Sequence, residues 1–479
     1  MTHDQLLALM PFMLLASASI VIILMIAARL SHFAIQVAGF LLLCLTVITM
    51  WYVRDILPQQ ILPLLIVDGY AALFTGIIIF SVGVVGLFSY IYFEEREENP
   101  KEYYILMFLA TLGAAILTIS RHFVSFFIGL EILSVSLYAL IAYLRNRNNA
   151  IEAGLKYLIL AALTSAFLLL GMALFYMETG QLEFTAIGEK LSGNDAGILY
   201  KMGIALMVVA IGFKLALVPF HLWAADVYQG APSPVTSFIA TASKAGVFAV
   251  LMRFALATHL QSSAFLMNVF SAIAIASMLI GNILALRQQN IKRLLAYSSI
   301  AHFGYLIVAF LPGNTEGIQA SVFYLFAYSI TILSAFGIVT MLSTRMKDAE
   351  DLNIYRGLFW KRPLMAAVLA VALFSLAGIP LTAGFLAKFV VLMSGVHSSL
   401  WLPVVVLVLS SVIGLYYYLR IISTLFAQAP VAEPRQKSLH PFFNFATYAT
   451  LIVLMLLICV LGVFPGPAME QIREFLLIR

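Results

Sequence analysis

Four lysines and one glutamate lie deep inside apolar stretches of this 479-residue chain. The lysines are Lys156, Lys214, Lys244 and Lys388, and the carboxylate is Glu131. A cation at the centre of a bilayer costs on the order of 3 kcal/mol even on the lenient insertion scale, so a chain that keeps several must neutralise them or use them. Burial and nearby charges shift the pKa of such groups, which lets them take up and release protons. The pattern predicts a path for charge through a membrane.

A glutamate and a lysine are the first expected elements of that path. Lys214 stands five residues before Pro219, and Glu131 is its natural partner. Because an opposite charge stabilises the charged lysine and burial opposes it, a pair that can be made and broken acts as a proton switch. A static ion pair, or a carboxyl kept neutral by hydrogen bonding, is the alternative.

The other lysines differ in their depth within the apolar stretches. Lys244 is the eleventh residue of the stretch from Pro234 and is too deep to reach the surface easily, so we expect it to be the central relay. Lys388 stands eight residues after Pro380 and mirrors Lys214. Lys156 is the sixth residue of its stretch, and its amine could reach the interface instead.

Two histidines and a fifth lysine have roles that the sequence leaves open. His221 follows a proline by two residues, and His302 lies near Ser298 and Ser299. An imidazole suits both a proton shuttle and a hydrogen-bonded packing position. Lys292 begins its stretch and is expected at the interface, although it lies 161 residues after Glu131, which keeps a functional role open.

Composition indicates the class of protein. The chain is 63% hydrophobic and 10% charged, with a mean hydropathy of +1.03, whereas about a quarter of the residues of a soluble protein are charged. Apolar stretches of about 20 residues recur along the chain, each long enough to cross the bilayer. We predict an all-α polytopic membrane protein with about 14 transmembrane helices. Nucleic-acid binding has no support in so apolar a chain, despite its net charge of +5.

Cofactor sites are not expected in this chain. The two cysteines, Cys44 and Cys459, lie in separate apolar stretches, which favours small core residues over a disulfide, a metal ligand or an iron–sulfur ligand. There is no convincing dinucleotide motif or phosphate-binding glycine loop. The aromatic residues Tyr416, Tyr417, Tyr418 and Trp360 are more simply interfacial than part of a quinone pocket.

Two stretches, 199–228 and 364–395, are too long for one straight crossing. The segment before Pro219 recurs before Pro380 at an offset of 161 residues, and each proline removes a backbone donor and clashes with an earlier carbonyl. We interpret both as discontinuous helices, five crossings apart and therefore opposite in direction, which is typical of inverted repeats. The expected organisation is one transmembrane domain, 1–479, with inverted five-helix repeats at 103–257 and 267–427 and flanking helices at 1–92 and 443–479.

The basic residues predict the orientation. Lysine and arginine are more frequent in the loops that follow odd-numbered spans, for example Arg145, Arg147, Arg345 and Lys347. The positive-inside rule then places both termini outside the cytoplasm.

Three segments carry a resemblance to a known family: 213–223 (FKLALVPFHLW), 226–232 (DVYQGAP) and 290–299 (NIKRLLAYSS). Together with Glu131 and the lysines, they resemble the antiporter-like subunits of the proton-pumping respiratory NADH:quinone oxidoreductase, complex I, over essentially the whole chain. Segments 355–360 (YRGLFW) and 414–420 (GLYYYLR) are similar to the N-type subunits. Lys388 agrees, because M-type subunits are expected to have a glutamate in that helix.

The resemblance implies a role for each matching residue. Glu131 and Lys214 would form the ion pair of a first half-channel, Lys244 the central relay and Lys388 the gate of a second half-channel, with Lys156 and His302 as secondary groups. NADH, FMN, iron–sulfur clusters and quinone would bind to partner subunits, both membrane and peripheral. The location implied is the bacterial inner membrane, with lipid around the chain and protons as the transported species.

Three other functions stay open. A subunit of a multisubunit cation/proton antiporter shares the fold and the glutamate–lysine pattern. A stand-alone carrier would need a further substrate pocket, and the sequence shows only groups suited to protons. A structural scaffold would use the lysines as static pairs.

Overall fold

The computed structural model describes residues 1–94, 96, 100–191, 197–428 and 441–477. In this part of the chain, 13 helices are long and apolar enough to cross a membrane. They are α1 (His3–Ala27), α2 (His32–Tyr52, extended by η1, Val53–Ile56), α3 (Gly69–Glu94), α4 (Lys101–Ile119), α5 (Phe123–Ile141), α6 (Asn148–Thr179), α8 (Ile198–Leu215), the continuous unit Ser233–Ala257, α12 (Ala264–Leu286), α13 (Ile291–Phe310), α14 (Thr315–Leu342), α18 (Trp401–Phe426) and α19 (Pro441–Val463).

Two shorter helices, α16 (Pro363–Ala377) and α17 (Ala383–His397), make up the remaining span. The predicted number of about fourteen spans is therefore confirmed. The connecting elements are α7 (Phe184–Leu191), α9 (Trp223–Gly230), η3 (Leu260–Ser262), η4 (Leu352–Tyr355), α15 (Leu358–Lys361), α20 (Gly466–Leu477) and an antiparallel hairpin of β1 (Gln59–Ile61) and β2 (Leu65–Val67).

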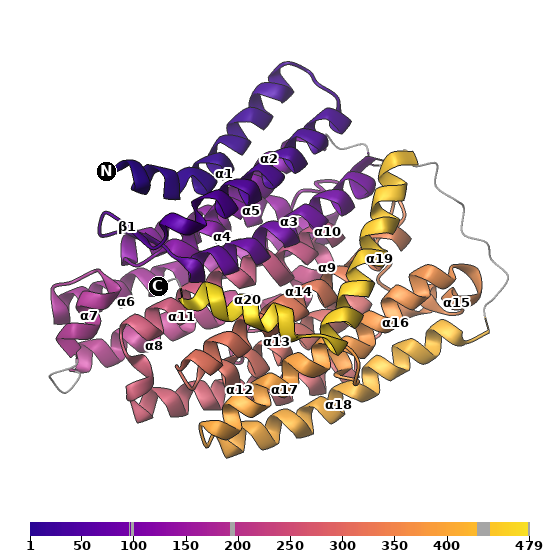
Figure 1. Cartoon of the computed structure of the whole chain (residues 1–479). Coiled ribbons are helices and arrows are strands. Elements are labelled where there is room, and N and C mark those ends of the chain that lie inside the picture. The colour runs from indigo at the N-terminus through magenta and orange to yellow at the C-terminus, as the bar shows by residue number, and fades with distance from the viewer. Residues whose placement is uncertain (95, 97–99, 192–196, 429–440, 478–479) are drawn as a thin grey trace.

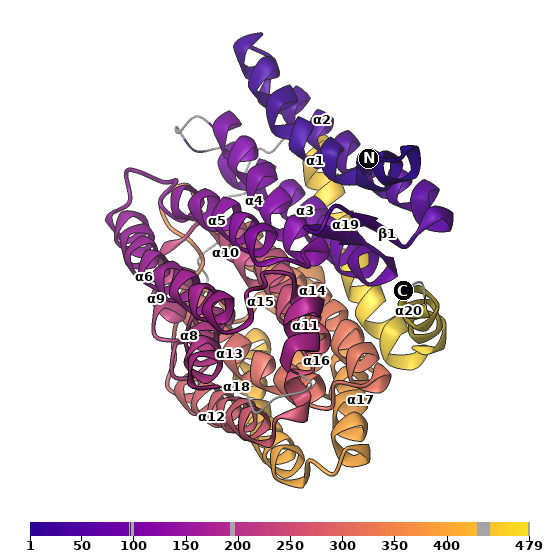
Figure 2. The same ribbon diagram turned by 90° about the vertical axis from the view of Figure 1, so that its left-hand side faces the viewer.

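The spans form one bundle with the first two helices at one edge and the ninth and thirteenth spans at the other. Figures 1 and 2 show α1 and α2 on one side of the bundle and α12 and α18 on the opposite side. The N-terminus and α20 lie at the same end of the bundle, as an even number of crossings requires.

Burial identifies the centre of the bundle. The most apolar window of the Ser233–Ala257 unit is 100% buried, and those of α14 and α13 are 94% and 89% buried. The corresponding windows of α1, α2 and α19 are 33% buried. Since lipid tails accept apolar side chains, outward-facing apolar residues are expected on the outer helices of a membrane protein. The helices that carry Lys244 and His302 are thus the innermost ones.

Both predicted helix breaks are present, and each starts two to three residues before the proline. α8 ends at Ala216 (φ +60°) and α16 ends at Gly378 (φ +83°), both in the left-handed conformation. At each end, two backbone N–H groups bond to carbonyls of the last turn, the arrangement of a Schellman cap. Each break thus begins at a left-handed residue at the end of the helix, and the proline lies two or three residues later in the non-helical segment.

A further irregularity, which was not predicted, lies in the eighth span. Helix α10 (Ser233–Phe238) continues as the π-helical segment η2 (Ile239–Ser243) and then as α11 (Lys244–Ala257). The segment has no internal proline or glycine, the residues that usually mark a distorted helix. Short π-helical turns often occur at functional sites, and this one ends at Lys244.

Candidate functional site

Lys244 is the most enclosed of the predicted relay lysines. It follows the π-helical segment in the innermost span, is 1% exposed, and its Nζ donates to Ser299 Oγ on α13 at 2.7 Å. The Phe303 ring lies 4.4 Å from Nζ, within the range of a cation–π contact. Within the part of the chain that the structure describes, Lys244 has no carboxylate at ion-pairing distance, so its charge is not fixed by a permanent counter-ion.

Lys214 and Glu131 each bind a different serine. Lys214, in the last turn of α8, donates from Nζ to Ser134 Oγ at 2.6 Å, and Glu131 accepts a 2.5 Å hydrogen bond from Ser165 Oγ on α6. Ser134 follows Glu131 by three residues on α5, which places the two on the same helix face. Among the described residues, no direct Glu131–Lys214 ion pair is formed, and the Ser134 hydroxyl itself donates to the Leu130 carbonyl.

Lys388 binds to the end of a broken helix. Its Nζ donates to the carbonyl oxygens of Leu376 at 2.9 Å and Ala377 at 3.1 Å, the last residues of α16. These carbonyls lack intrahelical partners and carry the negative end of the helix dipole, so they stabilise a cation. Here the break itself supplies the hydrogen-bond acceptors for the lysine.

His302 lies between Lys244 and Lys388 in a network of hydroxyl groups. Its Nδ1 is 2.7 Å from Tyr324 Oη and its Nε2 is 3.3 Å from Tyr418 Oη. Tyr418 Oη in turn lies 2.5 Å from Ser298 Oγ, one residue before the Ser299 that binds Lys244. Two hydrogen-bonded groups, Lys244 with Ser299 and His302 with Tyr418 and Ser298, thus meet at adjacent serines of α13.

A small cavity continues this network toward Lys388. It is lined by His302, Tyr324, Tyr328, Thr331, Ser375, Leu376, Gly384 and Ala387, and its volume of about 10 Å³ is close to that of a single water site. Tyr328 Oη is also buried at this cavity. Ser375 Oγ lies 3.0 Å from Thr331 Oγ1 and accepts the N–H of Gly384, which holds the two halves of the broken helix together.

Tyr417 and Tyr418 correct the sequence interpretation. They were expected at the interface, but they are 0% and 1% exposed and hydrogen-bonded in the bundle, whereas Tyr416 is 65% exposed. Three consecutive residues of a helix point in different directions, so only some can face the lipid. The sequence signal that could have identified Tyr418 was its alignment on α18 with the inward-facing Gly414 and Ile421.

Lys156 and His221 lie outside the buried network. The Lys156 side chain is 43% exposed and pairs with Glu152 at 2.7 Å and Asp226 at 2.9 Å, in agreement with the alternative in which its amine reaches the interface. Asp226 also pairs with Arg293 at 2.7 Å. Asp226 is thus a charged partner that sequence reasoning missed. His221 is buried in the turn between α8 and α9.

Lys292 corrects a second expectation. It was expected at the interface, but it is 0% exposed, and its Nζ donates to Asp348 Oδ2 at 2.8 Å and to the Ala231 carbonyl at 2.6 Å. A lysine at a helix start can be buried when a loop carboxylate covers it. Asp348 lies in the connection after α14, a part of the sequence that gave no signal of a buried acid.

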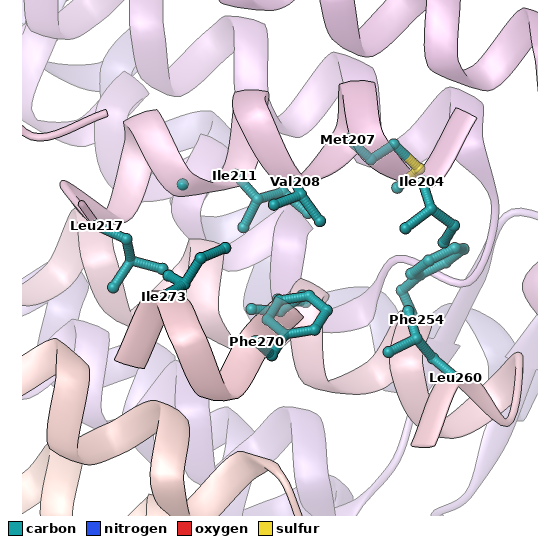
Figure 3. A pocket seen from close by; sticks show the side chains of 11 residues that line it. Ile204, Met207, Val208, Ile211, Leu217, Phe254, Leu260, Phe270 and Ile273 are labelled. Carbon is teal, nitrogen blue, oxygen red and sulfur yellow. The ribbon is translucent and has the colours of Figure 1, made fainter. Parts of the chain in front are cut away.

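An apolar recess lies beside the first broken helix. Figure 3 shows Ile204, Met207, Val208 and Ile211 of α8 facing Phe270 and Ile273 of α12 across it. Every labelled side chain in this view is hydrocarbon or thioether. Such a lining gives no polar groups for binding a small polar solute or conducting a proton, so the polar network and this recess are chemically distinct.

Comparisons with known proteins agree with this geometry. Residues 120–414 match the family described as NADH:quinone oxidoreductase/Mrp antiporter, TM. A chain of respiratory complex I from Thermus thermophilus is 32% identical with a TM-score of 0.82, and the match covers 96% of this chain and 98% of that one.

Two chains from other complexes are also similar. One belongs to the membrane-bound sulfane sulfur reductase, an archaeal respiratory membrane complex (26% identity, TM-score 0.85, covering 99% of this chain and 98% of that one). The other belongs to the Mrp complex from Dietzia sp. (20% identity, TM-score 0.84, covering 99% and 97%), and at this identity it shows the fold alone. The chain belongs to the NADH:quinone oxidoreductase/Mrp antiporter transmembrane family.

Proposed function

We propose that this chain is an N-type, proton-translocating membrane subunit of a bacterial NADH:quinone oxidoreductase. The observation that carries the proposal is a pair of buried polar groups that adjacent serines of α13 bring together: Lys244 with Ser299, and Ser298 with Tyr418 and His302, which lines the cavity beside Lys388. A network of groups that can each donate and accept a hydrogen bond can pass protons through a bundle that is otherwise apolar.

Each half of the network has one lysine at a broken helix. Lys214 with Glu131 serves the first half and Lys388 the second, and Lys244 connects them. When Lys244 takes up a proton, its charge repels the charge on the neighbouring lysines, which favours release further along the network. His302 is the shuttle of the second half. Lys156 and His221 serve the approach to Lys214, and Lys292 supports the structure around Lys244.

The N-type assignment rests on residues 355–360 and 414–420 and on Lys388. In this proposal NADH, FMN, the iron–sulfur clusters and the quinone belong to partner subunits, and this chain contributes no cofactor ligand. It lies in the cytoplasmic membrane of a bacterium with both termini outside the cytoplasm. The inverted repeats, 103–257 and 267–427, place the two broken helices in opposite directions, so that each half-channel opens to a different side.

The competing proposal is a subunit of a multisubunit cation/proton antiporter, since the matching family covers both kinds of complex. Deletion of the gene distinguishes the two. Membranes of the deletion strain should lose NADH-driven quinone reduction coupled to proton pumping and should keep sodium-linked antiport. Loss of antiport with intact NADH-driven pumping would favour the antiporter subunit instead.

A further inference from the structure

Asp348 joins parts of the chain that are distant in sequence. This carboxylate is 6% exposed and accepts hydrogen bonds from Tyr92 at 2.6 Å, Arg147 at 3.1 Å, Ser233 at 2.8 Å and Lys292 at 2.8 Å. Buried charges are costly unless paired and hydrogen-bonded, so this arrangement needs all of its partners.

The two oxygens of Asp348 have different partners. Oδ1 accepts hydrogen bonds from Tyr92 on α3 and from Arg147, the residue before α6. Oδ2 binds Ser233 at the start of α10 and Lys292 at the start of α13, and Lys292 also donates to the Ala231 carbonyl just before α10. The starts of these two helices are therefore held together by one closed set of hydrogen bonds.

These two helices carry the central contact of the proposed relay. Ser299 lies seven residues after Lys292 on α13, about two turns or 10 Å along the helix. Lys244 lies in the same continuous unit as Ser233, after the π-helical segment. The register between the helix starts consequently determines whether Lys244 Nζ meets Ser299 Oγ, which it does at 2.7 Å.

The far end of the same unit is held as well. Arg253 donates to both carboxylate oxygens of Asp68, each at 2.8 Å, and to the Thr118 carbonyl. A helix anchored at both ends cannot slide as a rigid body without breaking a buried, hydrogen-bonded carboxylate contact, which is strongly unfavourable. Its axial position relative to α13 is then set by Asp348.

We infer that Asp348 is a positioning residue for Lys244: it fixes the register of α10 and α13 in which Lys244 binds Ser299. The inference rests on the proposed function, because it assigns Asp348 a part in proton transfer and not only in folding. It predicts that Ser233, Asp348 and Ser299 all affect the same step, which is proton transfer at Lys244.

A double-mutant cycle in the assembled complex tests this. Ser233→Ala and Ser299→Ala should each lower protons pumped per NADH oxidised in reconstituted vesicles by roughly threefold, as expected for one lost hydrogen bond. The double variant should lose no more than either single variant, because coupled sites are non-additive. Ser237→Ala, which removes a buried hydroxyl bonded only within its own helix, is the matched control and should pump normally.

Three results would each overturn the inference. They are a double variant whose loss of pumping is the product of the two single losses, normal pumping by Ser233→Ala, and an equal loss of pumping in Ser237→Ala. If Ser233→Ala does not assemble, Asp348→Glu replaces it in the same cycle, since it keeps the charge and displaces it by one methylene. Lys244→Arg is measured in parallel: normal pumping by that variant would contradict the proposed relay, whereas a blocked Lys244→Arg with an additive cycle would contradict only the role of Asp348.

Discussion

In the described part of the chain, three of the lysines proposed as relay sites are bound by dipoles and not by carboxylates. Lys214 and Lys244 each donate to a serine hydroxyl, and Lys388 donates to two helix carbonyls. Lys292 is different, because Asp348 pairs with it directly. A permanent counter-ion would hold a lysine in its charged state, whereas a hydroxyl can serve both protonation states by reorienting its hydrogen. Lys214, Lys244 and Lys388 are therefore suited to proton transfer, whereas Lys292 is suited to a structural ion pair.

Glu131→Ala should leave assembly intact and lower proton pumping roughly tenfold, which corresponds to about 1.4 kcal/mol of interaction with Lys214. Glu131→Asp should be milder. Pumping is measured with a pH-sensitive dye in vesicles supplied with NADH. Glu102→Ala, at an exposed glutamate in the first turn of α4, serves as the control. Normal pumping by assembled Glu131→Ala would rule out its role as a switch.

Asp348 should stay charged throughout the physiological range. Burial raises its pKa, but Lys292, Tyr92 and Arg147 outweigh burial and hold the pKa of Asp348 well below its ordinary value of 3.8. A depressed folded-state pKa gives stability that is present above the unfolded pKa and is lost only as the pH falls through the folded one. The contribution of Asp348 to stability should therefore be constant from pH 5.5 to pH 8.

Asp348→Asn should accordingly destabilise the complex by the same amount at both pH values, by about 3–5 kcal/mol, because it leaves Lys292 buried without its counter-ion. The temperature at which the purified complex dissociates measures this, with Asp351→Asn at an exposed position as the control. A difference between wild type and variant that shrinks at pH 5.5 would show that Asp348 is already protonated there.

At the scale of residues, the sequence predicted Lys214, Lys244, Lys388 and Glu131 as intramembrane charges because ionisable groups stand out in apolar stretches. It could not predict the serines and tyrosines that bind them, since such residues are common on helices and only the packing decides which face they occupy. Lys292 and Tyr418 were misplaced for this reason: their burial depends on Asp348 and on α13, which are distant in sequence.

At the scale of elements, the helix breaks are built from left-handed residues. Gly378 can adopt φ +83° without strain, but Ala216 adopts φ +60° at a cost of about 1–2 kcal/mol, which the surrounding packing must offset. The prolines that revealed these breaks in the sequence follow the left-handed residues, and they prevent the helix from resuming its hydrogen bonds immediately.

Gly378→Ala should lower pumping in an assembled complex. An added Cβ would lie 3.0 Å from Lys388 Cδ and 3.2 Å from its Nζ, and alanine would carry the strain of a positive φ. Both effects displace Lys388 from its carbonyl ligands. Gly76→Ala, on α3 with nothing within 4 Å of the added atom, is the control and should pump normally. Equal pumping by the two variants would show that Lys388 does not depend on this geometry.

Pro380→Ala should keep the break. The left-handed Gly378 and the Gly384 N–H bond to Ser375 Oγ hold the chain out of the helix even when residue 380 can donate a hydrogen bond. A structure of the variant complex would check this. A continuous helix from α16 into α17 would mean that the proline alone causes the break.

At the scale of the whole molecule, the number of spans and both broken helices were predicted from the sequence, because the length of an apolar stretch and a proline within it are strong local signals. The π-helical segment before Lys244 was not predicted, since its sequence, Ile239–Ser243, suits a regular helix. The two anchors of the eighth span, at Asp348 and Asp68, join residues more than 100 positions apart and could be found only in the folded chain.

The similar chains point to other subunits as partners of this chain. The similar chains belong to multisubunit assemblies, which implies other membrane subunits as partners. If the proposed function is right, the chain should co-migrate with flavin and iron–sulfur proteins in one large complex, and its pumping should depend on NADH oxidation by those partners.

The replacement of Lys244 by arginine tests the account most directly. Arginine keeps the charge and much of the length but is not deprotonated in proteins, so it should block a relay that needs a neutral amine for part of its cycle. Proton uptake and release are measured with a pH-sensitive dye in NADH-supplied vesicles that contain the assembled complex. We predict that Lys244→Arg assembles normally and pumps at least tenfold less than wild type. Full pumping by the assembled variant would show that Lys244 supplies only a fixed charge and that the proton takes another route.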